Sequence, residues 1–285
     1  QLNYQKQFGD INLRSSFRYL FEDIDDELFD ASSSTFQTEG VETLGQGTTN
    51  ISVGSALFKE KTQNFFLTAD VDWKDKIILG GLIRTDRSSL FGENNRDQIF
   101  YRGSLAYRLG EDLDYDWIDE LKLRASYGTA GLRPLFGDIF ETFSVSQSGI
   151  SPFQVGNPDL RSPEIGEFEA GIDFNFLGKY RFSFTYADSK TKDALITVPL
   201  SGAVPGSRQV QNVGETEYTS FEVALSGTPV SNDNFSWDFG ITASTTENKY
   251  GSLGGVAPFN RIFPATLFDP APALNIFRVE EGQPY

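Results

Sequence analysis

The 285-residue chain contains no cysteine, no histidine and no methionine, and it has no long apolar run. Without cysteine it has no disulfide framework, no thiolate nucleophile and no thiolate metal site. Without histidine it lacks the usual general base and the commonest metal ligand. No stretch approaches the about 20 apolar residues that a membrane-spanning helix needs, so helical spanning is excluded.

Basic residues are also scarce, with 24 Lys and Arg against 40 Asp and Glu and a formal net charge of −16. No basic stripe is present to meet phosphates, so we expect no nucleic-acid partner. The sequence has neither a G-x-S-x-G nucleophile elbow nor a phosphate-cradling glycine loop. Glu167 and Glu169 share a strand face, but nothing else assembles a catalytic site around them. We therefore expect no enzyme, no cofactor and no metal.

Aromatic residues are abundant, with 26 Phe and 11 Tyr, and they alternate with polar residues. The clearest case is the pair of segments 167–176 and 180–186, which flank a tight turn at 177–179. Successive strand side chains point to opposite faces, so each segment forms a strand with one apolar face and one polar face. The pattern predicts an all-β fold.

Ten strands of this kind are predicted along the chain. They span residues 2–8, 11–21, 61–73, 76–86, 98–109, 120–128, 164–176, 180–190, 217–227 and 235–246. Short connections alternate with long ones, which cover 22–60, 87–97, 129–163 and 191–216. Short turns at one end and long loops at the other are typical of an antiparallel transmembrane β-barrel of the outer-membrane type. A soluble β-sandwich with an aromatic core is the alternative.

The two strand faces predict different surroundings. Trp73 and Tyr180 lie beside short turns, where aromatic girdles mark the periplasmic rim of such barrels. The opposite face carries charge, as expected of a water-filled lumen. Its arginines are Arg14, Arg18, Arg84, Arg102, Arg108 and Arg124. We expect ordinary ion pairing with Glu167, Glu169 and Asp173, whereas lining a permeation path or contacting a plug is the alternative.

Acidic residues are concentrated between positions 22 and 30, in a segment predicted to be a surface loop. They are Glu22, Asp23, Asp25, Asp26, Glu27 and Asp30. A solvated loop explains them. Calcium binding stays open, although the run lacks the spacing of a known calcium loop.

Several segments resemble, in the same order, the SusC/RagA family of TonB-dependent outer-membrane transporters. They are RTDRSSLFGENNR at 84–96, LKLRASYG at 121–128, GNPDL at 156–160 with Glu164, GIDF at 171–174, Lys192-Asp193 with Leu195, NVGE at 212–215 and Phe221-Glu222. Arg87 stands where the family usually has glycine. We expect the polar residues of 86–96 and 157–159 to pin loops through side-chain-to-backbone hydrogen bonds, with substrate contact as the alternative.

The resemblance implies a barrel of about 22 strands with an N-terminal plug. Residues 1–285 are then expected to be part of that barrel domain, truncated at both ends and without the plug. The implied function is active import of large nutrients, glycans or peptides, across the bacterial outer membrane. The implied partners are TonB, acting through the missing N-terminal region, a SusD-like lipoprotein and outer-membrane lipid.

Two other functions stay open, a passive porin-like or other outer-membrane barrel and a soluble β-rich binding module. The sequence assigns no ligand-binding residue. The loop aromatics Phe136, Phe140, Phe143 and Phe153 are able to stack on sugar rings, but we expect them to pack the loop against its neighbours.

Overall fold

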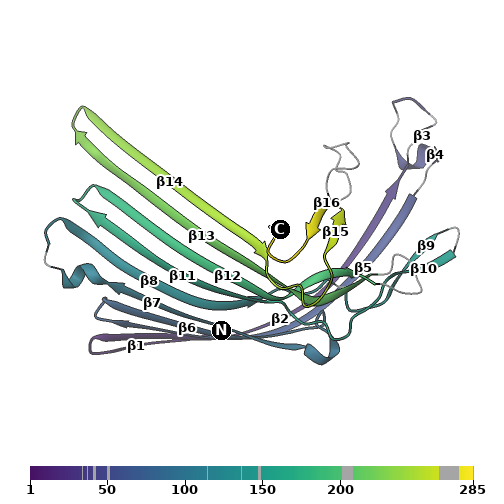
Figure 1. The fold of residues 1–285 in the computed structure, drawn as a ribbon, viewed down its shortest axis with the longest axis horizontal. Coiled ribbons are helices and arrows are strands. Elements are labelled where there is room, and N and C mark those ends of the chain that lie inside the picture. Colours follow the sequence, from purple (N-terminus) through teal and green to yellow (C-terminus); the bar gives the residue numbers. More distant parts are fainter. Residues whose placement is uncertain are drawn as a thin grey trace.

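The computed structural model describes residues 1–33, 35–36, 38–40, 43–49, 52–113, 115–135, 137–146, 149–200, 208–262 and 276–284. Ten strands form one curved antiparallel sheet (Figure 1). They are β1 (Leu2–Phe8), β2 (Ile11–Ser32), β5 (Ser52–Trp73), β6 (Ile77–Ser88), β7 (Asp97–Arg108), β8 (Ile118–Gly131), β11 (Glu164–Phe176), β12 (Tyr180–Pro199), β13 (Arg208–Asn232) and β14 (Phe235–Tyr250). Each pairs with the next in this order, so all ten predicted strands are confirmed.

Smaller elements lie in the connections. They are the strand pairs β3 (Thr35–Phe36) with β4 (Gly47–Thr49), β9 (Thr142–Ser146) with β10 (Gly149–Gln154) and β15 (Phe259–Ile262) with β16 (Ile276–Val279), and the 3-10 turns η1 (Leu44–Gln46), η2 (Glu93–Asn95) and η3 (Leu109–Asp112). No helix among the described residues is both long and apolar enough to cross a membrane. Figure 1 shows the three small strand pairs together at one end of the sheet, opposite the tight turns.

Tight turns join the strands at one end of the sheet. At Trp73–Lys76 and Phe176–Lys179 the two central residues all have positive φ, between 55° and 60°. Each connection has three residues between the paired strand ends, and its two residues with positive φ turn the chain in the sense that matches the right-handed twist of the flanking strands. Gly178 adopts this conformation freely, whereas Lys74, Asp75 and Leu177 adopt it against the preference of L-residues.

At the other end several strands run further than predicted. β2 and β5 have 22 residues each, or about 70 Å at roughly 3.3 Å per residue. This exceeds the about 30 Å hydrocarbon core of a bilayer. The predicted loop at 22–60 is therefore wrong for most of its length, and the predicted loop at 191–216 is shortened by β12 and β13.

The acidic segment belongs to this strand extension and is no loop. Lys59 and Lys61 of β5 pair with Asp25 and Asp23 of β2 at 2.8 and 2.9 Å. These cross-strand pairs continue the ladder where the apolar alternation ends. Successive residues of a strand point to opposite faces, which divides the acidic run between two surfaces. No group of three or more potential metal-ligating residues occurs in the described part of the chain.

Apolar residues form continuous rows across the outer face of the sheet, because directly paired residues lie on the same face. One row follows Leu123, Ile172, Phe184, Val223 and Ala243 across five strands. These side chains are partly exposed. Leu67 of β5, which lies on the same outer face, is 53% exposed. The ten-stranded sheet is a single layer, so the soluble sandwich alternative is wrong. An apolar outer face fits lipid contact.

Apolar side chains are fully buried where the connections fold back over the inner face. Leu90, Phe91 and Leu160 are each at most 4% exposed. β1 and β14 are the two edges of the sheet, which is an open part of a barrel wall (Figure 1).

Candidate functional site

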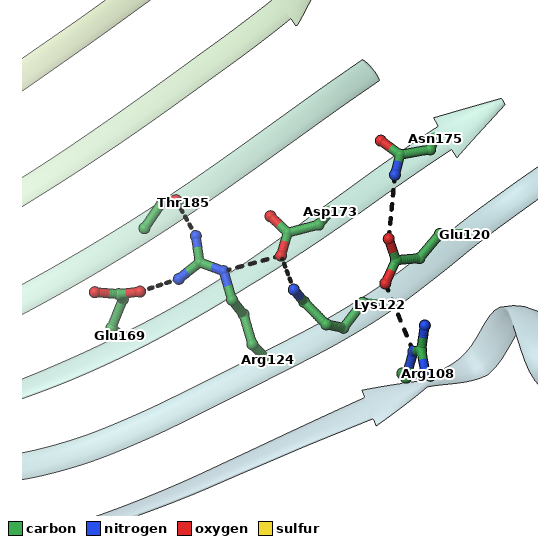
Figure 2. A network of polar contacts seen from close by, with 8 residues as sticks. All are labelled: Arg108, Glu120, Lys122, Arg124, Glu169, Asp173, Asn175 and Thr185. Carbon is green, nitrogen blue, oxygen red and sulfur yellow. Dashed lines mark hydrogen bonds and ion pairs between the residues drawn. The ribbon is translucent and has the colours of Figure 1, made fainter. Parts of the chain in front are cut away.

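The inner face of β8 and β11 carries a network of charged and polar side chains (Figure 2). Arg124 donates a hydrogen bond from Nη2 to Thr185 Oγ1 at 2.5 Å and one from Nη1 to Glu169. Its Nε lies 3.6 Å from Asp173 Oδ2, which also pairs with Lys122 Nζ at 2.8 Å. The guanidinium thus links three neighbouring strands, β8, β11 and β12.

Gly171 makes the contact between Arg124 of β8 and Thr185 of β12 possible. It lies directly between Arg124 and Thr185 in the register of the inner face. A Cβ atom at Gly171 would come 2.6 Å from Arg124 Cζ, so a side chain there would displace the guanidinium. The sequence alternation did not reveal this role, because glycine has neither polar nor apolar character to count.

The network continues toward the tight turns. Asn175 donates from Nδ2 to Glu120 Oε2 at 3.1 Å, and Arg108 Nε lies 3.6 Å from Glu120 Oε1 (Figure 2). These groups are partly exposed, and such ion pairs contribute about 0–1 kcal/mol each. The network therefore fixes side-chain positions on a wet surface more than it stabilises the fold.

The expected ion pairing is confirmed for some of the arginines only. Arg108 and Arg124 pair as described, and Arg84 pairs with Asp86 at 2.9 Å. Arg18 lies over the ring of Phe66 at 5.8 Å. Arg14, Arg102 and Glu167 make no ion pair within the described residues. Their charged groups lie on the inner face of the sheet. There they are available for contact with other molecules or with other segments of the protein.

A second polar cluster, the loop clasp, joins two segments that lie far apart in the sequence. Gly92 N donates to Leu160 O at 2.7 Å. Asn94 Nδ2 donates to Asp159 Oδ1 at 2.8 Å, and Asn95 Nδ2 donates to Asp159 O at 2.9 Å. The loop clasp consists of these five residues, and it attaches the connection after β6 to the one before β11.

Gly92 is required by close packing in the loop clasp. A Cβ atom there would lie 2.2 Å from Pro158 O. Asn157 accepts a hydrogen bond from Asp159 N at 3.1 Å and donates one to Val210 O at 2.9 Å. These contacts are the loop pinning expected from the two polar segments, and they connect the loop clasp to β13.

A further pair of contacts holds the same connection against β12 and β13. Asn212 accepts from Arg161 N at 3.0 Å and donates to Arg161 O at 2.9 Å. Arg161 also pairs with Asp193 at 2.7 Å. The connection between β8 and β11 is thus fastened on both sides to the inner wall.

The loop aromatics give no clear binding surface. Phe136 lies outside the described residues, and the side chain of Phe153 is not described. Phe140 and Phe143 are 50% and 53% exposed. Neither stacking on a ligand nor complete packing in the loop follows from these positions.

The fold and the two-faced sheet define one class of protein, the transmembrane β-barrel, of which this chain forms part of the wall. The sequence profile described as "TonB dependent receptor-like, beta-barrel" matches residues 1–267. The chain belongs to this family of TonB-dependent receptors, and its location is the bacterial outer membrane. Membership in this family also confirms the expectation that the chain is no enzyme.

Two curated relatives are TonB-dependent receptors of Formosa agariphila. The chain is 29% identical to receptor P26 over 254 residues, which are 79% of this chain and 26% of the relative. It is 27% identical to receptor P3 over 267 residues, or 88% of this chain and 27% of the relative. The chain therefore spans about a quarter of the length of these relatives.

Solved structures share the fold. The RagAB peptide transporter matches with a TM-score of 0.78 and 22% identity, covering 93% of this chain and 31% of that chain. The outer membrane transporter YddB from Escherichia coli matches with a TM-score of 0.62 and 12% identity, covering 87% of this chain and 32% of that chain. The first match confirms the SusC/RagA-like fold expected from the sequence.

Proposed function

We propose that the complete protein is a TonB-dependent active importer of large nutrients, glycans or peptides, across the outer membrane. Residues 1–285 contribute about ten strands of a barrel of about 22 strands, together with extracellular connections. A plug, TonB acting through a segment outside this chain, and a SusD-like lipoprotein complete the assembly.

The family match over residues 1–267 carries this proposal. The open sheet supports it as well, because the edges β1 and β14 leave backbone groups unpaired in the main sheet. Hydrocarbon does not tolerate such edges, so further strands must close the wall. The polar inner face supports passage of hydrophilic cargo, and one solved structure with this fold is named a peptide importer.

Import is tested in the bacterium that carries the complete gene. The gene and tonB are deleted separately, and uptake of fluorescent oligosaccharides and peptides is measured in each strain. The proposal predicts that at least one cargo is taken up by the parent strain and by neither deletion strain. Uptake that needs the gene but not TonB would indicate a passive porin. No cargo that depends on the gene would contradict import altogether.

A further inference from the structure

The inner face of the sheet changes in character between β11 and β12. Each of β2, β5, β6, β7, β8 and β11 carries at least two charged residues on the inner face, and we call this part of the sheet the charged wall. The polar network of Figure 2 belongs to it and ends at the hydrogen bond from Arg124 to Thr185 Oγ1 of β12. From there the inner face continues over β12, β13 and β14, which lie side by side (Figure 1).

The inner-facing residues of β12, β13 and β14 are mostly short and uncharged. They come from residues 183–189 of β12, 218–224 of β13 and 242–248 of β14, which pair directly in four rows, and we call this surface the hydroxyl wall. Seven of its twelve side chains are serine or threonine, and only Glu222 is charged. The hydroxyl wall therefore differs in chemistry from the rest of the inner face.

Two further charges lie on the inner face of these strands, but close to the tight turns. Arg181 directly follows Tyr180, the first residue of β12, and Asp238 is the fourth residue of β14. Asp238 accepts a hydrogen bond from Thr228 Oγ1 at 2.5 Å. Both charges lie outside the four rows of the hydroxyl wall, where Glu222 makes no ion pair within the described residues.

The hydroxyl wall is also hollowed. A cavity of about 330 Å³ lies against it, and six of the eight residues that line it face inward. Thr185, Glu222 and Thr242 are among them. Short side chains leave this space open to the lumen, whereas long side chains such as Lys122 and Arg124 cover the neighbouring part of the charged wall.

The two walls interact differently with a hydrophilic molecule. Hydrogen bonds to charged groups are roughly twice as strong as those between neutral groups, so the charged wall holds a polar partner in place. Neutral hydroxyls contribute less net free energy, because water competes for their hydrogen bonds. Passage through a channel requires contacts that are weak enough to be left again. The hydroxyl wall meets this requirement and the charged wall does not.

The charged wall also has groups that can hold a plug. Arg14, Arg102 and Glu167 make no ion pair within the described residues, and they lie on β2, β7 and β11. A plug with complementary charges gains several charge-assisted contacts on this side. On the hydroxyl wall Glu222 is the only such group. A plug is therefore held more strongly on one side of the lumen than on the other.

We propose that cargo crosses the lumen along the hydroxyl wall of β12, β13 and β14, whereas the charged wall keeps its contact with the plug. The inference rests on the proposed import function and names the side of the barrel on which the passage opens. The alternative is a plug that packs closely on the short side chains of the hydroxyl wall, with the passage elsewhere.

Thiol labelling of intact cells that carry the complete gene tests on which side the passage opens. Thr242→Cys places a thiol on the hydroxyl wall, and Thr68→Cys is the matched control on the charged wall. Both threonines face inward, and each lies five residues from a tryptophan near the tight turns, Trp237 and Trp73. Any cysteine outside residues 1–285 is first replaced by serine. A membrane-impermeant biotin maleimide is added outside the cells, together with unlabelled forms of the oligosaccharides and peptides of the uptake experiment.

Each variant is compared between the parent strain and the tonB deletion strain, so that local differences in thiol reactivity cancel. Thr242→Cys is expected to react at least fivefold faster when TonB is present, and Thr68→Cys to react within twofold of its rate without TonB. Ala224→Cys and Ala106→Cys, one on each wall, form a second pair that is expected to behave in the same way. A TonB-dependent gain on the hydroxyl wall that does not exceed the gain on the charged wall overturns the proposal, and so does no gain at all.

A larger side chain then tests whether the cargo itself passes along the hydroxyl wall. Thr242→Trp narrows the passage and is expected to slow uptake at least fivefold. Val223→Trp is the control on the outer face of the neighbouring strand, and it is expected to leave uptake within twofold of the wild type. Uptake within twofold of the wild type in Thr242→Trp, with the variant present in the membrane at the wild-type amount, overturns the proposal.

The outcomes separate this inference from import itself. Uptake that depends on TonB, together with equal labelling gains on both walls, refutes the passage along the hydroxyl wall and leaves import intact. Uptake that does not depend on TonB refutes active import. Thr242→Trp still tests the hydroxyl wall in that case, because a passive channel along this wall is narrowed in the same way.

Discussion

The guanidinium of Arg124 lies across Gly171, and this one missing side chain lets an arginine of β8 contact β12. An ideal Cβ atom at Gly171 would approach Arg124 Cζ to 2.6 Å. The polar network of Figure 2 thus depends on a residue that takes no part in any of its hydrogen bonds or ion pairs.

Gly171→Ala is expected to destabilise the complete barrel by at most about 1 kcal/mol, because the added methyl group displaces the flexible guanidinium of Arg124 from its partly exposed ion pairs. Gly103→Ala is the control on β7, where a Cβ atom meets no atom within 4 Å. The temperature at which the barrel loses its fast migration on detergent gels measures both. Equal transition temperatures for the two variants would show that the position of Arg124 does not depend on the missing side chain at Gly171.

The loop clasp is expected to hold the connection between β8 and β11 closed. Asn94→Ala combined with Asn95→Ala removes two hydrogen bonds, each contributing about 1 kcal/mol. Trypsin cleavage at Arg133 or Arg161 on intact cells should then be about thirtyfold faster, since about 2 kcal/mol is lost and cleavage follows the open population. Glu93→Ala, in the same 3-10 turn, should leave the rate unchanged. Unchanged cleavage in the double variant would argue that other contacts close the connection.

Leu177 has a φ of 55° in the tight turn between β11 and β12. Leucine avoids this conformation, whereas asparagine accepts it readily. Leu177→Asn is therefore expected to stabilise the barrel by about 0.5–1 kcal/mol. Lys179→Asn tests whether asparagine stabilises the turn at any position, because Lys179 does not have a positive φ. The unfolding temperatures of the two variants and the wild type are compared by their change of mobility on detergent gels. A Leu177→Asn variant that is less stable than the wild type would show that Leu177 is not strained.

Lys76 and Asp112 form an ion pair beside the tight turns. The hydrogen bond from Lys76 lowers the pKa of Asp112, and the same bond raises the pKa of Lys76. The carboxylate's contribution is present above its unfolded pKa and is lost as pH falls through its lowered folded pKa. The ammonium's contribution is present below its unfolded pKa and is lost as pH rises through its raised folded pKa.

Asp112→Asn is therefore expected to reduce stability at neutral pH and to make no difference in strong acid, below the lowered pKa of Asp112. The pair is exposed, so the effect should be small and should decrease in 1 M salt. Urea unfolding of the wild type and the variant at pH 3, 5 and 7 measures the difference. A constant difference at all three pH values would mean that packing, and not charge, explains the effect of the substitution.

The alternation of side chains predicted the strands and their two faces because it is a local property with a period of two residues. Phe168 and Glu167 reveal opposite faces without any knowledge of their neighbours. The order of the strands followed from the short turns. The family resemblance also located the two segments that meet in the loop clasp, although it did not predict which atoms join.

A local sequence pattern could not predict contacts between residues that lie far apart in the sequence. Asp23 and Asp25 lie where the apolar alternation ends, so the segment reads as a loop until its lysine partners on β5 are known. Asn64 shows the same difficulty, since one polar residue on a polar face carries no sign of burial. Asn64 is 4% exposed, and it lines a cavity together with Gly131 and Arg133, which lie nearly seventy positions later in the chain.

The central claim is that this sheet separates lipid from a wet lumen, and two adjacent residues of β13 test it directly. Val223 belongs to the outer apolar row, and Ala224 points to the inner face. Nitroxide labels on Val223→Cys and Ala224→Cys report each face in the complete protein in liposomes, after any cysteine outside residues 1–285 has been replaced by serine; these residues themselves contain none. We predict that oxygen relaxes the label at 223 more strongly and that a water-soluble nickel chelate relaxes the label at 224 more strongly. Equal or reversed accessibilities would contradict the account.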